Sequence, residues 1–398
     1  MNSKDSVFVS RVIRSLRMNR KTLAARELGG STENLQRKLA KELIIPSKSL
    51  QHKLQCQDFR KYLMDATRAH RKYRVAVDKA LEILNTLPIY ERVKLLFDHW
   101  AEDDNYGKTM VQHTRAIKKA LMRIPDNLIP ASFLTTNARR KIRSLVLFDP
   151  FVGNGDVLAD LLKITAEQHM RISEDKRLEF VIYINDISPN MVRLAEKKLS
   201  KPSFSKTLSR HNASIRTVSS FTINFLDDQE RQKKFVEEIN ESVQKRFLKE
   251  LNEPPTPLLP ESVDIAIVSQ TLDVIKGIET KNKVLALLHD YLKVGGNLIV
   301  IGEDPARFTV SSDLDIVSTL FFETIFEPFG KAETEAELKR IRNGRLMIIG
   351  EGSEKIDAVH SIFVRVAQRI YRPSELGEDL VEQNPQAKQN GTKTSNKS

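Results

Sequence analysis

The chain has 398 residues, of which 40% are hydrophobic, and a formal net charge of +12 at pH 7. This length is sufficient for two domains, and no apolar run reaches the about 18–20 residues that a membrane-spanning helix needs. Cys56 is the only cysteine, which excludes an internal disulfide and indicates a reducing, intracellular setting such as cytoplasm, nucleoid or nucleus. The Arg-rich first 26 residues also fit a mitochondrial presequence, although the helix signals after Asp5 favour mature protein.

Positive charge is concentrated in the N-terminal part. Residues 1–143 contain 30 Lys and Arg against 14 Asp and Glu, a net charge of +16, whereas residues 144–398 contain 34 against 38. A basic module beside a mildly acidic domain is typical of proteins that bind polyanions. A solvated helical surface would have the same excess of charge. We expect nucleic acid to bind through residues 1–143, and a protein partner is also compatible with this sequence.

Residues 1–135 have the pattern of a basic, all-helical domain, because apolar positions recur at helical spacing over 7–16, 35–43, 73–84 and 93–100. Residues 22–41 fit either a DNA-reading helix-turn-helix or a plain helical hairpin. In the first case the second helix offers its basic side chains to nucleic acid. Basic and aromatic residues also alternate over 59–74, a pattern that suits either stacking on unpaired bases or an ordinary core. The predicted nucleic-acid contacts are therefore Arg37, Lys38, Lys41, Arg71, Lys72 and Arg74.

A strand, a glycine-containing loop and a helix follow one another over residues 145–162. The loop has glycine at 153 and 155, which allows a sharp turn and close approach of a ligand to the backbone, although ordinary turns also use two glycines. The apolar strand 180–184 comes next and ends near Asp186, 31 residues after Gly155. An acidic side chain at the end of the second strand of an α/β sheet can accept both ribose hydroxyls of an adenosine.

Strands and helices continue to alternate toward the C-terminus. Further strands are predicted at 264–268, 297–301, 321–326 and 361–367, with a helix at 282–292. This alternation predicts an α/β fold with a doubly wound, Rossmann-like sheet over residues 136–370. Residues 371–398 are polar and rich in Gln, Asn, Lys and Ser, so we expect a disordered tail.

Five segments resemble, in order, the motifs of class I S-adenosylmethionine-dependent methyltransferases: DPFVGNGD (149–156), NDISPNMVRLAEKKL (185–199), FTINFLDD (221–228), VDIAIVSQTLDVI (263–275) and LLHDYLKVGGNLIVIG (287–302). The first is most similar to that of nucleic-acid amino-methyltransferases. The resemblance implies S-adenosylmethionine as the cofactor, with Asp186 at the ribose and Asp227 or Asp228 at the adenine amine. Around the methionine end and the ribose it implies Asp149, Phe151, Gly153, Asn154, Gly155 and Ile187.

The segment after the fourth strand departs from the amino-methyltransferase pattern. That family has Asn, Asp or Ser, two prolines and an aromatic residue here, whereas this chain has Ser269, Gln270, Thr271 and Leu272. Base-flipping enzymes need a stacking surface for the target base. Two hypotheses follow: a methyltransferase acting on DNA or RNA, or a methyltransferase fold without turnover that serves as a nucleic-acid-binding or partner subunit.

The candidate catalytic residues are Ser269, Gln270 and Asp273, which follow the fourth predicted strand. The alternative role for these side chains is to cap the strand end and hydrogen-bond the loop. The histidines and the single cysteine do not have the spacing of metal ligands, so no metal site is predicted.

Overall fold

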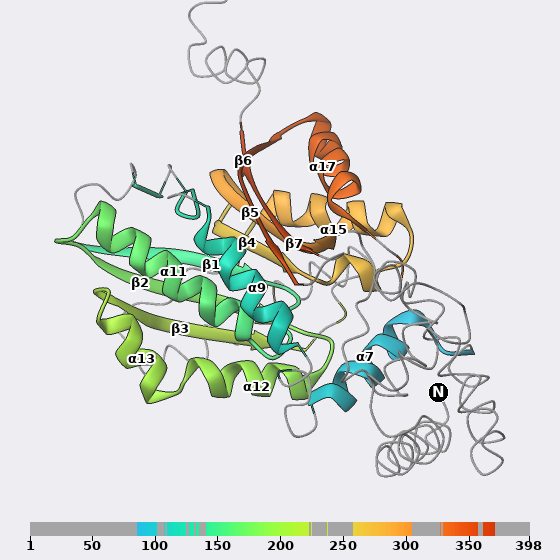
Figure 1. Ribbon diagram of the computed structural model, residues 1–398, viewed down its shortest axis with the longest axis horizontal. Coiled ribbons are helices and arrows are strands. Elements are labelled where there is room, and N and C mark those ends of the chain that lie inside the picture. The colour runs from blue at the N-terminus through green and yellow to red at the C-terminus, as the bar shows by residue number, and fades with distance from the viewer. Residues whose placement is uncertain are drawn as a thin grey trace, which may run out of the picture.

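The computed structural model describes residues 86–101, 107, 110–124, 127–130, 133–134, 141–222, 224, 237, 258–304, 327, 329–356 and 361–370 (Figure 1). The described strands form one seven-stranded sheet in the order β3-β2-β1-β4-β5-β7-β6. Strands β1 to β5 are parallel, and β7 runs antiparallel to both β5 and β6. The bounds are β1 Ile142–Asp149, β2 Arg177–Asn185, β3 Ala213–Phe221, β4 Val263–Ser269, β5 Leu292–Asp304, β6 Leu346–Lys355 and β7 Ser361–Arg369.

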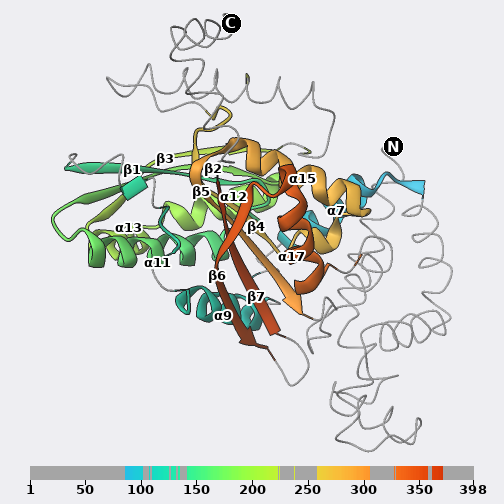
Figure 2. The same ribbon diagram turned by 90° about the horizontal axis from the view of Figure 1, so that it is seen from above.

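Helices cover both faces of this sheet. One face carries α9 (Val111–Met122), α11 (Asp156–Ile172), α12 (Pro189–Leu199) and α13 (Pro202–Ser209), and the other carries α15 (Ile278–Tyr291) and α17 (Lys331–Arg340). Figure 2 shows α9 beside β6 and β7, away from α17. Short 3-10 helices lie at η2 (Leu272–Val274) and η3 (Ile341–Asn343), and α7 (Ile89–Ala101) packs against α12.

The core follows from the two-residue period of a strand. In β1, Leu145 and Leu147 pack on the face of α9 and α11, whereas Val146 and Phe148 pack on the face of α15 and α17. All four side chains are buried, which is why residues 145–148 of this strand are continuously apolar. The prediction of a doubly wound α/β sheet is confirmed.

The last pair of strands differs from the expectation. The predicted strand 361–367 lies within β7, but its partner β6 is Leu346–Lys355, which we did not predict. Only the first residues of β6 are apolar, and the strand is at the edge of the sheet, where most of its side chains are not buried. The predicted strand 321–326 and the tail 371–398 lie outside the described residues.

Two helices on the N-terminal side of residue 135 pack against the α/β domain. Residues 93–100 lie within α7, and the second helix is α9, whereas the helices expected over 7–16, 35–43 and 73–84 lie outside the described residues. In α9, Lys118 forms an ion pair with Asp160, and Lys119 and Arg123 form ion pairs with Glu354. Much of the positive charge of this helix is thus balanced by the α/β domain.

Among the helices of the described ranges, none combines the length and the hydropathy that a membrane span requires.

Candidate functional site

A cavity of about 270 Å³ lies where β1, β2 and β4 end at their carboxyl side. Open α/β sheets bind ligands at this edge. The loops after the three strands contribute Gly153, Asp186 and Gln270, among others, to its lining. Helix α7 supplies a further part of the wall with Ile89, Tyr90, Val93 and Phe97. The cavity thus lies between the glycine loop and a helix that precedes the whole sheet.

Both glycines of the loop after β1 have left-handed backbones, with φ of 52° at Gly153 and 80° at Gly155. Gly153 lines the cavity, and its N–H donates to Oδ2 of Asp186 at 3.0 Å. A Cβ on Gly155 would lie 2.8 Å from Cα of Ala195, in the middle of α12. Gly153 therefore joins the loop to the acidic residue of β2, whereas Gly155 allows α11 to pack closely on α12.

Asp186 is 5% exposed and lies at the centre of the hydrogen-bond network in the cavity. Its Oδ1 accepts from the N–H of Ser188 at 2.8 Å, in addition to the bond from Gly153 to Oδ2. An ionised carboxylate has about four acceptor positions, so two remain for a ligand. Burial raises the pKa of Asp186 to about 6. A ligand that donates two hydroxyl hydrogen bonds suits this carboxylate.

Helix α7 is connected to the same network through Asp98. Oδ1 of Asp98 accepts from Oγ of Ser188 at 2.6 Å and from Nδ2 of Asn190 at 3.3 Å. Ser188 is also the N-cap of α12, because its Oγ accepts from the N–H of Met191. One serine therefore holds the start of α12, the carboxylate of Asp186 and the helix that covers the cavity.

Asp149 and Asn154 are buried and shape the glycine loop. Oδ1 of Asp149 accepts from the N–H of Phe151 at 3.2 Å, and burial raises the pKa of Asp149 to about 7, with a further contribution from the charge of Asp186. Oδ1 of Asn154 accepts from the N–H of Asp156, at the first turn of α11. Neither is among the described residues that line the cavity, whereas Phe151 and Ile187 are.

The candidate catalytic residues lie in two different places. Ser269 and Gln270 line the cavity, and Gln270 has a left-handed backbone (φ 51°) whose N–H donates to the carbonyl of Ile301. Asp273 is 8% exposed and its Oδ1 accepts from the N–H of Phe329 at 2.7 Å. Asp273 is absent from the described lining of the cavity. This hydrogen bond is the kind of loop contact that the sequence left open as the alternative to catalysis, and burial raises the pKa of Asp273 to about 7.

Two groups of predicted site residues lie outside the described part of the chain. Asp227 and Asp228, the predicted adenine contacts, lie outside the described residues. The same is true of the six predicted nucleic-acid contacts: Arg37, Lys38, Lys41, Arg71, Lys72 and Arg74. Within the described ranges, no group of three or more His, Cys, Asp or Glu side chains is suited to a metal ion.

The place of α7 at this site could not be predicted from its sequence. Its cavity residues Ile89, Val93 and Phe97 recur every four residues, which is the apolar stripe of an amphipathic helix. That signal predicts a buried helix face but not what the face covers. Nothing in the local sequence indicates that Asp98 contacts Ser188, 90 residues further along the chain.

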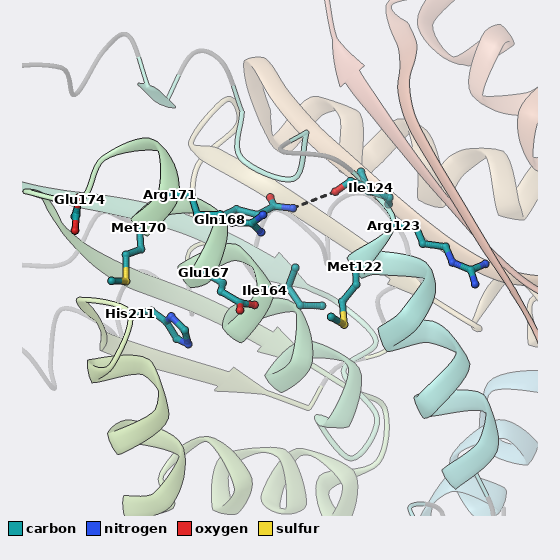
Figure 3. Close-up of a pocket in the computed structure, with 10 residues that line it drawn as sticks. All are labelled: Met122, Arg123, Ile124, Ile164, Glu167, Gln168, Met170, Arg171, Glu174 and His211. Atoms are coloured by element: carbon teal, nitrogen blue, oxygen red, sulfur yellow. Dashed lines mark hydrogen bonds between the residues drawn. The ribbon is translucent and has the colours of Figure 1, made fainter.

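A second, wider hollow of about 800 Å³ lies between the C-terminal ends of α9 and α11 and the turn at His211 (Figure 3). Arg123 and Arg171 contribute two positive charges to its wall, and Glu167 and Glu174 contribute two negative charges. The end of α11 leads into β2, so this hollow is at the amino ends of the strands. The smaller cavity is at the carboxyl ends and is therefore the candidate site.

No family model and no curated protein matches this chain. Among solved structures, an Aquifex aeolicus SAM-dependent methyltransferase is 12% identical with a TM-score of 0.32, and covers 61% of this chain and 92% of its own. A Methanosarcina mazei SAM-dependent methyltransferase is 13% identical with a TM-score of 0.36, covering 60% and 98%.

A third similar structure is the Burkholderia thailandensis 1,6-didemethyltoxoflavin-N1-methyltransferase with bound 1,6-didemethyltoxoflavin and S-adenosylhomocysteine. It is 14% identical with a TM-score of 0.36, covering 72% of this chain and 92% of its own.

Proposed function

We propose that this chain is an S-adenosylmethionine-dependent methyltransferase whose cofactor binds in the cavity beneath α7. The observation that carries the proposal is the position of Asp186. It ends β2, lines the cavity beside Gly153, and keeps two acceptor positions after bonding Gly153 and Ser188. The strand order, with an antiparallel β7 inserted between β5 and β6, is the order expected of a class I methyltransferase sheet.

The cavity residues fit the parts of this cofactor. Asp186 would accept hydrogen bonds from the ribose hydroxyls, and Gly153 leaves room beside them because it has no side chain. Tyr90, Phe97 and Phe151 would supply apolar and aromatic surface around the bound molecule. The buried carboxylate of Asp149, directly behind the loop, favours a positively charged ligand once it is ionised.

When bound, S-adenosylmethionine supplies a methyl group activated by a sulfonium. The protein then has to align the acceptor and exclude water, and a dedicated base is unnecessary when the acceptor is already neutral and electron-rich. Helix α7 would exclude water from its side of the cavity. Ser269 and Gln270 line the end of β4, where their polar atoms would orient the acceptor. Asp273 would act indirectly, by holding the segment at Phe329.

For the methyl acceptor we propose nucleic acid. The net charge of +16 over residues 1–143 supports this class, because a basic module attracts a polyanionic substrate to the domain beside it. The predicted contact residues of this module lie outside the described part of the chain.

The second candidate function is a cofactor-binding subunit without turnover that binds nucleic acid or a protein partner. It is favoured by the segment Ser269–Leu272, which lacks the two prolines and the aromatic residue of amino-methyltransferases. A flipped base would have no stacking partner within these four residues.

A methyl-transfer assay separates the two functions. The full chain is incubated with S-adenosylmethionine labelled in its methyl group and with DNA, RNA or protein as acceptor. The first function predicts label in nucleic acid, and predicts that Gln270→Ala reduces the rate while cofactor affinity stays the same. Cofactor binding without label in any acceptor would support the second function instead. Label confined to protein would contradict the proposed acceptor.

A further inference from the structure

The helices α12 and α13 present an unusual concentration of positive charge on the α/β domain itself. Residues 189–210 contain six Lys or Arg residues and one acidic residue, Glu196. The two helices follow one another along the sheet edge formed by β3 (Figure 1). Five of the six basic residues are exposed, and we call these the edge cations: Arg193, Lys197, Lys201, Lys206 and Arg210.

The edge cations have no acidic partner within the described ranges. The sixth basic residue, Lys198, forms an ion pair with Asp156, and Glu196 accepts a hydrogen bond from Ser220. The C-terminal end of α9 is the opposite case, because Lys118, Lys119 and the C-cap Arg123 form ion pairs with Asp160 and Glu354. The edge cations are therefore available to an external anion, whereas Lys118, Lys119 and Arg123 already have a carboxylate partner.

The spacing of the edge cations suits an extended anion. Arg193 and Lys197 lie four residues apart in α12, which places them on one side of the helix with a rise of about 6 Å between them. Lys201 follows as the N-cap of α13. Lys206 and Arg210 repeat the same spacing on α13. A row of regularly spaced cations matches a polymer whose charges are also regularly spaced.

The uncharged surface between these cations distinguishes the partner. A helix that lies on a membrane needs exposed large apolar side chains beside its basic ones. The large exposed hydrophobic residues of the described chain all lie elsewhere, and α12 and α13 expose Ser203 and Ser205 instead. Hydroxyl groups and cations are the side chains that contact nucleic-acid phosphates. We propose that the edge cations bind the phosphodiester backbone of a nucleic acid.

This surface starts beside the candidate site. The N-cap of α12 is Ser188, which bonds both Asp186 and Asp98, so Arg193 lies little more than one turn from the cavity network. A strand bound along α13 and α12 would be led toward the cavity. The edge cations are not part of the cavity lining, so their role does not depend on cofactor binding or turnover.

The test compares two variants of the full chain that lose the same charge. The edge variant is Lys197→Gln, Lys201→Gln and Lys206→Gln, and the control is Lys118→Gln, Lys119→Gln and Arg123→Gln in α9. Binding of a fluorescein-labelled single-stranded oligonucleotide is measured by anisotropy over a range of salt concentrations. Each lost phosphate contact lowers the slope of log K against log salt by about 0.7, so the edge variant should lower it by about 2. The control should leave the slope unchanged.

Equal slopes in the edge variant and the unmodified chain would overturn the proposal, as would an equal decrease in both variants. Thermal unfolding confirms that each variant is folded, and the pair Arg193→Gln and Arg210→Gln repeats the test at other positions. Phosphatidylserine vesicles provide the alternative anionic surface. A variant that loses vesicle binding but keeps its oligonucleotide affinity would show that the surface binds membranes instead. Calorimetric titration with S-adenosylmethionine should give the same affinity in all variants, which separates this inference from the proposed function.

Discussion

Asp98 gives the sharpest prediction, because it lies on α7 and yet contacts the hydrogen-bond network around Asp186. Its carboxylate accepts hydrogen bonds from Ser188 and Asn190, and Ser188 in turn donates to Asp186. Burial, with a smaller contribution from the negative charge of Asp98, raises the pKa of Asp186 to about 6. Asp98 therefore acts on Asp186 in two ways: it positions Ser188, and it disfavours ionisation of the carboxylate.

Two substitutions separate these effects. Asp98→Ala removes the acceptor, and a lost hydrogen bond that positions Ser188 should weaken cofactor binding by about 1 kcal/mol, or roughly fivefold. Asp98→Asn keeps an acceptor oxygen and removes the charge. Its affinity at pH 8 should match that of the unmodified chain. Because the pKa of Asp186 falls when the charge of Asp98 is removed, the loss of affinity on acidification should occur at lower pH.

The assay is calorimetric titration with S-adenosylmethionine between pH 5 and pH 8. In the unmodified chain the affinity should fall as the pH decreases through about 6, because a protonated Asp186 loses acceptor capacity. An Asp98→Ala variant with unchanged affinity and an unchanged pH midpoint would refute the role of Asp98. An Asp98→Asn variant whose midpoint moves to higher pH would refute the electrostatic argument.

Two further predictions concern the stability of the fold. Gly155→Ala should lower the free energy of unfolding, measured in urea, by about 2 kcal/mol or more, because position 155 has a left-handed backbone and a Cβ there would contact Ala195. Gly344→Ala is the control, since Gly344 has a similar φ but a Cβ there would have no contact under 3.6 Å. Equal losses of stability in the two variants would contradict the role of the contact with Ala195. Burial lowers the pKa of His169 from its ordinary value of 6.5 to about 4 in the folded protein. The unfolded chain therefore binds a proton more readily, so the free energy of unfolding is unaffected by His169 above pH 6.5 and decreases by about 3 kcal/mol as the pH falls to 4. His169→Leu should remove this pH dependence from the unfolding free energy, and an unchanged dependence would show that His169 does not cause it.

The central part of the sheet could be predicted because its signals are local. Strands β1, β2 and β4 each contain a continuous apolar run that is buried on both faces, at 145–148, 180–184 and 265–268, and each is followed by a polar or glycine-containing loop. The signal is weaker for β6, where the apolar run 346–349 is followed by glycine and polar residues and only Leu346 of the run is buried. Edge strands depend on their neighbour for pairing more than on their own sequence.

In the candidate site, too, residues marked by a local sequence pattern could be predicted, and residues placed by long-range contacts could not. Gly153 and Asp186 could be identified because their spacing reflects one strand–loop–helix–strand unit. The roles of Asp98 and of the α7 residues depend on contacts between segments distant in sequence, which no local pattern encodes. Asp273 shows that a local position can also point to more than one role. Its place after β4 made it a candidate catalytic residue, whereas in the structure its side chain accepts a hydrogen bond from the backbone N–H of Phe329.

The central claim is that Asp186 binds the ribose of S-adenosylmethionine. Its most direct test is calorimetric titration of the full chain at pH 8, where Asp186 is ionised, with Asp186→Ala as the variant. We predict binding on the order of micromolar for the unmodified chain. The variant should bind at least about tenfold more weakly, since a hydrogen bond to a charged group contributes about 1.5–3 kcal/mol. Equal affinity in the two proteins, or the absence of binding by the folded unmodified chain, would contradict the claim.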